Sequence, residues 1–312
     1  MRPALASALT AFVLSLAPIP GRAQPAPGSP APEDAASRVE DFLRVAAGGR
    51  DAADIRALIA SNEVLAQAGY GGQLPRLSQI FAYGVVDIDE LAALGRLQRL
   101  SAGGLLTGYD LCVQAAGGAG GCAKDGTVGY GLCVKTEGGR VAGCDPQGSL
   151  GYALCVEHGG TPQQCKPGGS VGYGLCVKGS GQVDGCSADG SVGYAVCVAH
   201  TGSFKGCRVD GSLGYGMCVS QNGSLPDCRN GSLGYGLCVQ NGGPVSGCAA
   251  DGTLGYGLCT GVNGQYASCS PRGSVGYALC VKALGRAADC GETASQSEGL
   301  CALKYHSTMS CR

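Results

Sequence analysis

The sequence has no tryptophan and only four phenylalanines among its 312 residues. So few bulky aromatic side chains exclude a large conventional aromatic core, and another element must hold the chain together. Long apolar runs are also missing after the N-terminal segment, where no stretch approaches the roughly 18 apolar residues of a membrane helix. We therefore expect no membrane span in the mature chain.

An excess of positive charge is absent as well. Residues 107–312 carry 13 Lys and Arg against 13 Asp and Glu. Because nucleic-acid binding needs clustered basic side chains, we expect no nucleic-acid partner. No Gly-x-Ser-x-Gly elbow lies between a strand and a helix, and there is no His-Glu-x-x-His motif. We predict that the chain is not an enzyme, has no cofactor and contains no catalytic, cofactor-binding or metal-binding residues.

The N-terminus has the form of a secretory signal peptide. Arg2 supplies positive charge, residues 4–17 form a short apolar region, and small residues precede a cleavage site expected after Ala23. Residues 24–32 are rich in proline and predict a semi-extended linker. We therefore predict a signal peptide over residues 1–23, a linker over 24–32, and export to the periplasm or the cell exterior.

A helical segment is predicted over residues 33–106. Apolar residues recur at helical spacing over 51–68, and Gly69 is expected to end that helix. Pro75 favours the start of a short helix that reaches Tyr83. The pattern at Asp87 to Glu90 resembles a capping box ahead of a further helix. This segment is expected to form a small domain or an N-terminal cap, or to offer a docking surface for a partner.

Cysteine and glycine are abundant, with 20 and 57 residues. All cysteines lie in ten consecutive repeats of about 21 residues over 107–312, and regular repeats of this kind predict a stack of units. An even number of cysteines in an exported chain predicts a disulfide framework. The first cysteines of the ten repeats are Cys112, Cys133, Cys155, Cys176, Cys197, Cys218, Cys238, Cys259, Cys280 and Cys301. The second cysteines are Cys122, Cys144, Cys165, Cys186, Cys207, Cys228, Cys248, Cys269, Cys290 and Cys311.

The cysteine order favours disulfides within repeats. Pairing the first cysteine with the second in each copy uses all of them, whereas pairing between copies leaves Cys112 and Cys311 over. Each bridge would then close a loop of about 11 residues, worth roughly 2.5–3 kcal/mol in the chain-entropy description. A thiol store for a soft metal such as Cu(I) or Zn²⁺ is the alternative, but no Cys-x-x-Cys pair occurs.

Flanking residues indicate whether the repeated unit is a helix or a strand. Ser or Thr stands six positions before the first cysteine in nine copies, where a helix has its N-cap. Gly stands five positions after that cysteine in nine copies, where a helix ends in the left-handed conformation. The end copies add capping boxes at Thr107 with Asp110 and at Ser295 with Glu298. We predict a disulfide-rich, α-rich tandem-repeat solenoid with one short capped helix and one loop per repeat; the alternative is a β-solenoid with one strand per repeat.

Tyrosine stands three positions before the first cysteine in nine copies. We expect each ring to be buried over the glycines of the next repeat. In the alternative interpretation, the rings form an exposed ladder that stacks on sugar rings or recognises ice. Together these features predict an exported structural or binding scaffold with an unknown partner, protein or glycan, and the thiol store and the flat recognition face are its alternatives.

Overall fold

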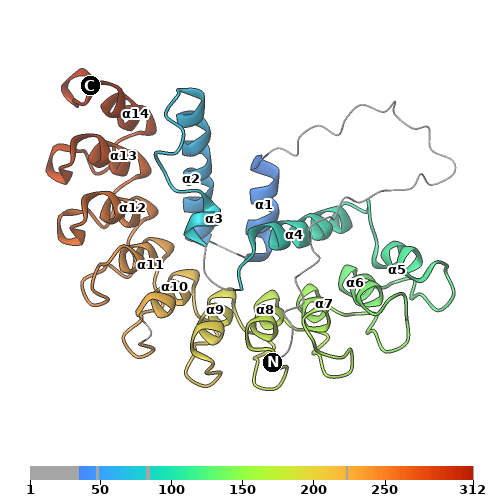
Figure 1. Ribbon diagram of the computed structural model, residues 1–312. Coiled ribbons are helices and arrows are strands. Elements are labelled where there is room, and N and C mark those ends of the chain that lie inside the picture. Colours follow the sequence, from blue (N-terminus) through green and yellow to red (C-terminus); the bar gives the residue numbers. More distant parts are fainter. Residues whose placement is uncertain (1–34, 47–48, 82–84, 223, 312) are drawn as a thin grey trace, which may run out of the picture. The chain divides into compact units, whose positions relative to one another are not determined.

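The computed structural model describes residues 35–46, 49–81, 85–222 and 224–311 (Figure 1). The expected signal peptide and the proline-rich linker lie outside these residues. In the described part of the chain, no helix has the length and apolar character that crossing a membrane requires.

Four helices precede the repeats. They are α1 (Ala35–Ala46), α2 (Gly49–Gln67), α3 (Leu77–Ile80) and α4 (Ile88–Ala102). Helix α2 is followed by Gly69 at a φ of 81°, and Asp87 caps α4 by accepting from the backbone N–H groups of Asp89 and Glu90. The short helix expected from Pro75 is smaller than predicted, because α3 has a single turn. Helix α1 packs along α4.

Each repeat contributes one α-helix, and the described residues contain no strand, so the helical prediction is confirmed over the β-solenoid. The helices follow one another side by side in chain order (Figure 1). They are α5 (Gly108–Ala116), α6 (Val128–Thr136), α7 (Leu150–Glu157), α8 (Val171–Ser180), α9 (Val192–Thr201), α10 (Leu213–Asn222), α11 (Leu233–Gln240), α12 (Leu254–Asn263), α13 (Val275–Leu284) and α14 (Gln296–Tyr305). Single 3-10 turns are η1 (Tyr266–Ser268), η2 (Ala287–Asp289) and η3 (Met309–Cys311).

The predicted capping residues set the ends of these helices. In repeat 5, the Ser191 hydroxyl accepts from the Tyr194 N–H at 3.0 Å, and Gly202 ends the helix at a φ of 67°. Both predicted capping boxes, in the first and last repeats, are present. In two repeats the positive φ falls one residue earlier than predicted, at Gly159 and Gly242. Local capping therefore offsets the poor helix propensity of the glycines inside each helix.

The capping hydroxyl also joins each repeat to the next. Ser170 Oγ donates to the carbonyl of Gly190 at 2.5 Å, and the Ser170 N–H donates to the carbonyl of Ala188 at 2.8 Å. Equivalent hydroxyl bonds recur from Thr127 to Ser274. One hydroxyl thus accepts from its own helix and donates to its neighbour, which explains why Ser or Thr recurs at this position.

A glycine four residues before the first cysteine lets the next repeat come close. A Cβ on Gly172 would lie 2.1 Å from the carbonyl oxygen of Gly190, with no room for any side chain. The tenth repeat has Ser297 there, and no further repeat packs against it in the described part of the chain. Two residues before the first cysteine the chain has Gly or Ala, which faces the preceding repeat, except in the first repeat, which has Asp110. The first and tenth repeats therefore differ from the interior ones at positions that contact a neighbouring repeat elsewhere in the array.

Candidate functional site

A disulfide joins the two cysteines of each repeat, and no cysteine is free. The Cα atoms of each pair lie 5.6–5.9 Å apart, and the sequence separation is 10 or 11 residues. The pairs are Cys112–Cys122, Cys133–Cys144, Cys155–Cys165, Cys176–Cys186, Cys197–Cys207, Cys218–Cys228, Cys238–Cys248, Cys259–Cys269, Cys280–Cys290 and Cys301–Cys311. In this oxidised state the chain offers a soft metal no thiolate ligand.

The repeated tyrosines of the interior repeats are buried, with side chains at most 2% exposed. The ring of Tyr173 covers Gly169 in the turn before its own helix, where a Cβ would lie 2.3 Å from the ring. Its hydroxyl accepts from the Lys166 N–H at 3.2 Å and lies 3.4 Å from Cys155 Sγ of the preceding repeat. Burial is as expected, but the expected packing on glycines of the next repeat is wrong. Helical side chains point toward the helix N-terminus, so each ring points toward the preceding turn and the disulfide of the preceding repeat.

Burial of the tyrosines also shapes their chemistry. Burial raises the pKa of the phenols of Tyr152, Tyr173, Tyr235 and Tyr256, which keeps them neutral over a wider pH range. A ring that is covered on all sides cannot stack on a sugar. The exposed tyrosine ladder is therefore ruled out for these repeats.

The disulfide-closed loops are where the repeats differ from one another. They run from the helix C-terminus to the second cysteine, and most of their residues are exposed or half-buried. Residues 159–164 read Gly-Gly-Thr-Pro-Gln-Gln, whereas residues 202–206 read Gly-Ser-Phe-Lys-Gly. The loops therefore display different side chains from one repeated frame. We call this set of loops, residues 117–121 to 285–289, the loop edge.

Apolar contacts hold neighbouring loops together. Phe204 covers Gly185 of the preceding loop, and Leu225 covers Gly206 in the same way. Both side chains are partly buried against the core. The loop edge therefore has a packed base, while charged residues such as Lys205 remain exposed. Sequence reasoning missed this second ladder, although an apolar residue three positions before the second cysteine in most repeats was a usable signal.

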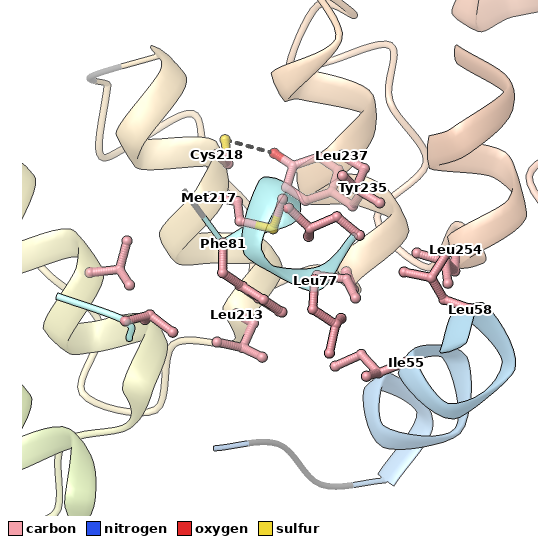
Figure 2. Close-up of a cluster of buried hydrophobic side chains, with 14 of the residues drawn as sticks. Ile55, Leu58, Leu77, Phe81, Leu213, Met217, Cys218, Tyr235, Leu237 and Leu254 are labelled. Carbon is pink, nitrogen blue, oxygen red and sulfur yellow. Dashed lines mark hydrogen bonds between the residues drawn. The ribbon is translucent and has the colours of Figure 1, made fainter. Parts of the chain in front are cut away.

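The N-terminal helices pack on one side of the array, which we call the docking face. It consists of apolar residues five and one positions before the first cysteine, which lie on one face of each repeat helix. Figure 2 shows Ile55 and Leu58 of α2 and Leu77 of α3 among docking-face side chains such as Leu213 and Leu254. The N-terminal segment thus shares a hydrophobic core with the repeats.

Carboxylates of α2 reinforce this contact at the ends of repeat helices. Asp51 Oδ1 accepts from the Leu233 N–H at 3.1 Å, and Asp54 Oδ2 accepts from the Leu254 N–H at 3.3 Å. These N–H groups belong to the first residues of α11 and α12, where the helix dipole favours negative charge. The N-terminal segment therefore caps two helices of the array.

A cavity of about 470 Å³ lies between the N-terminal segment and repeats 3 to 5. Arg44 and Gln98 line one side, and the first turns of α7, α8 and α9 line the other. None of the described lining residues is acidic, in contrast to the capped ends of α11 and α12. The N-terminal segment therefore leaves part of the docking face uncovered here.

A charged cluster joins α4 to repeats 3 and 4. Glu90 lies at the start of α4, and its side chain is only 6% exposed. His158 Nε2 lies 3.1 Å from Glu90 Oε1, and Lys178 Nζ donates to Glu90 Oε2. Glu157, which is exposed, brings a second carboxylate, and ligand atoms of Glu90, Glu157 and His158 all lie within 4.8 Å of one another.

Burial acts on the two carboxyl groups of this cluster with different net results. Burial by itself raises the pKa of Glu90, but the hydrogen bonds to His158 and Lys178 outweigh it and leave that pKa below its usual range. Partial burial raises the pKa of Glu157, and the charge of Glu90 raises it further. The hydrogen-bond partners of Glu90 therefore stabilise its ionised carboxylate, whereas the negative charge of Glu157 is less well compensated.

No local sequence pattern marks this cluster. His158 has a histidine counterpart in only one other repeat, His200, and Glu90 is recognisable only as part of a helix cap. Compared with protein families, curated proteins and solved structures, the chain matches none, so its function has to be argued from this geometry.

Proposed function

We propose that the chain is an exported scaffold that binds another protein through the loop edge. One observation carries the proposal: the buried residues repeat from copy to copy, whereas the exposed side chains of the disulfide-closed loops, apart from recurring glycines, do not. Variable side chains on a fixed frame are the usual design of repeat proteins that bind partners along an extended surface.

Disulfides suit this role in the oxidising compartment that an exported protein reaches. Ten bridges fit oxidising surroundings, and each closes its loop before a partner arrives. A loop that is already closed loses less conformational freedom on binding, which favours affinity. The balance of charges in the repeats fits a protein surface better than nucleic acid.

The alternatives receive less support. In the described repeats, the residues that recur most regularly at the surface are glycines of the loops, which have no side chain to match a sugar or an ice lattice. The oxidised cysteines argue against a thiol store. The proposal assigns no catalytic role to the chain.

The test uses the full oxidised chain, immobilised and exposed to the exported protein fraction of its own host. A loop variant replaces the exposed residues Arg140, Gln163 and Lys205 by Ala, and a control variant replaces Glu63 and Gln67 on α2. We expect a specific partner to be retained by the wild type and the control and lost by the loop variant, with unchanged melting temperatures. Equal retention by the loop variant, or no specific partner at all, would show that the loop edge is not a binding surface.

A further inference from the structure

The cluster of Glu90, Glu157 and His158 combines the donor types that bind a divalent metal. One imidazole nitrogen and two carboxylates come from helices that are far apart in sequence, α4 and α7. His158 directly follows α7, so Glu157 and His158 are adjacent residues at the C-terminal end of that helix. The site thus bridges the N-terminal segment and the array.

The separation of the two inner donors fits a shared metal. His158 Nε2 and Glu90 Oε1 are 3.1 Å apart. Two ligands bound to Zn²⁺ at about 2.0–2.1 Å with a tetrahedral angle lie about 3.3 Å apart, so only a small movement is needed. A hydrogen bond can occupy the same geometry, as it does here, and a metal would replace its proton.

Glu157 supplies the third ligand. Glu157 reaches the surface, and its carboxylate already lies within 4.8 Å of the donor atoms of Glu90 and His158. Rotation can therefore bring an oxygen to the metal without disturbing the core. The exposed side also provides an entry path and room for a water molecule as a fourth ligand.

Lys178 holds Glu90 from the opposite side. Its ammonium group is bonded to Oε2, which leaves Oε1 directed at His158. Partners of this kind orient a ligating carboxylate in known metal sites, and they are hydrogen-bonded to the oxygen that does not bind the metal. The charge of Lys178 offsets one carboxylate, so a divalent ion is balanced mainly by the other.

We propose that Glu90, Glu157 and His158 bind a borderline divalent cation such as Zn²⁺, which fastens the N-terminal segment to repeats 3 and 4. The mixed nitrogen and oxygen set favours Zn²⁺ over Ca²⁺, which takes six to eight oxygen ligands. The site is independent of the loop edge and stands whether or not the chain binds a protein partner. A metal bound there would stabilise the contact between the N-terminal segment and the repeats.

The experiment titrates the full oxidised chain with Zn²⁺ by calorimetry and with Co²⁺ by visible absorption. The variants are Glu157→Gln and His158→Gln, and the control is His200→Gln, a histidine at the end of α9 away from this cluster. Glu90 is left in place because its loss would leave Lys178 without its carboxylate partner. Circular dichroism and intact mass verify the fold and the ten disulfides of each variant.

We expect one Zn²⁺ per chain and a Co²⁺ spectrum in the visible range for the wild type and His200→Gln. Either cluster variant should weaken binding by at least about 10-fold. Zn²⁺ should also slow proteolysis within residues 35–102 of the wild type and not of the cluster variants. Binding that is equal in wild type and His158→Gln would show adventitious ions only and overturn the proposal, and so would the absence of stoichiometric binding.

Discussion

Replacing Gly255 by Ala tests the contact between neighbouring repeats. In an isolated helix this change is stabilising by about 1 kcal/mol. Here the new Cβ would lie 2.2 Å from the carbonyl oxygens of both Gly273 and Ser274, which are backbone atoms and cannot rotate away. The next repeat must therefore move, which strains the packing and lengthens the hydrogen bond from Thr253 Oγ1 to Gly273.

The magnitude follows from these opposing effects. Overpacking costs about 1–3 kcal/mol. Weakening the two hydrogen bonds that Thr253 donates to the next repeat costs roughly 1 kcal/mol each. After the gain in helix propensity of about 1 kcal/mol is subtracted, we expect a net loss of roughly 2–4 kcal/mol.

The assay is urea unfolding of the oxidised protein followed by circular dichroism, and the matched control is Ser297→Ala. Ser297 occupies the equivalent position of the tenth repeat and is exposed, so its replacement should change the free energy of unfolding by less than about 0.5 kcal/mol. A Gly255→Ala protein at least as stable as the wild type would refute the close-approach argument.

Three further outcomes are expected. Tyr173→Phe leaves the Lys166 N–H without its acceptor and should cost about 1–3 kcal/mol in thermal unfolding, whereas Tyr305→Phe, at a residue that is 55% exposed, should cost almost nothing; equal effects would contradict the packing role. Because burial raises the folded-state pKa of Tyr152 and its equivalents, their contribution to stability is present below the unfolded pKa of about 10 and lost as pH rises through the folded value. Absorbance at 295 nm should therefore show the buried tyrosines forming phenolate together with unfolding, after exposed ones such as Tyr305 have ionised; phenolate formation by the buried set in the folded protein would refute this. Deleting residues 127–148 removes one complete repeat and should give a soluble, fully oxidised protein by mass, whereas deleting residues 138–148 leaves Cys133 without its partner and should give mixed disulfides.

The helices of the repeats could be predicted because their signals are local. A hydroxyl at the N-cap and a glycine at the C-terminus act within one turn of backbone, and both are visible in a single copy such as residues 191–202. The sequence also indicates that apolar residues such as Leu213 and Met217 lie on one face of the helix. These features depend on helical spacing alone.

The sequence does not show whether a side chain contacts the preceding or the following repeat. Tyr173 can cover glycines on either side, and only the tilt of helical side chains toward the N-terminus decides that it faces the preceding disulfide. The site at Glu90 was hidden for another reason. Glu90 and His158 are 68 residues apart, and no local pattern says that α4 docks beside α7.

Closing every disulfide within its own repeat has a consequence for the chain under mechanical load. A pulling force applied at the two ends of the array passes through each bridge and bypasses the loop behind it. Only the segments between bridges, such as residues 122–133, can then be drawn out. With 11 residues at about 3.4 Å each and 5.9 Å between the Cα atoms of a bridge, each repeat would lengthen to roughly 43 Å and stop there. Reduction of the bridges would release the loops and raise that length to roughly 70 Å, so the redox state of the surroundings sets how far the chain can stretch.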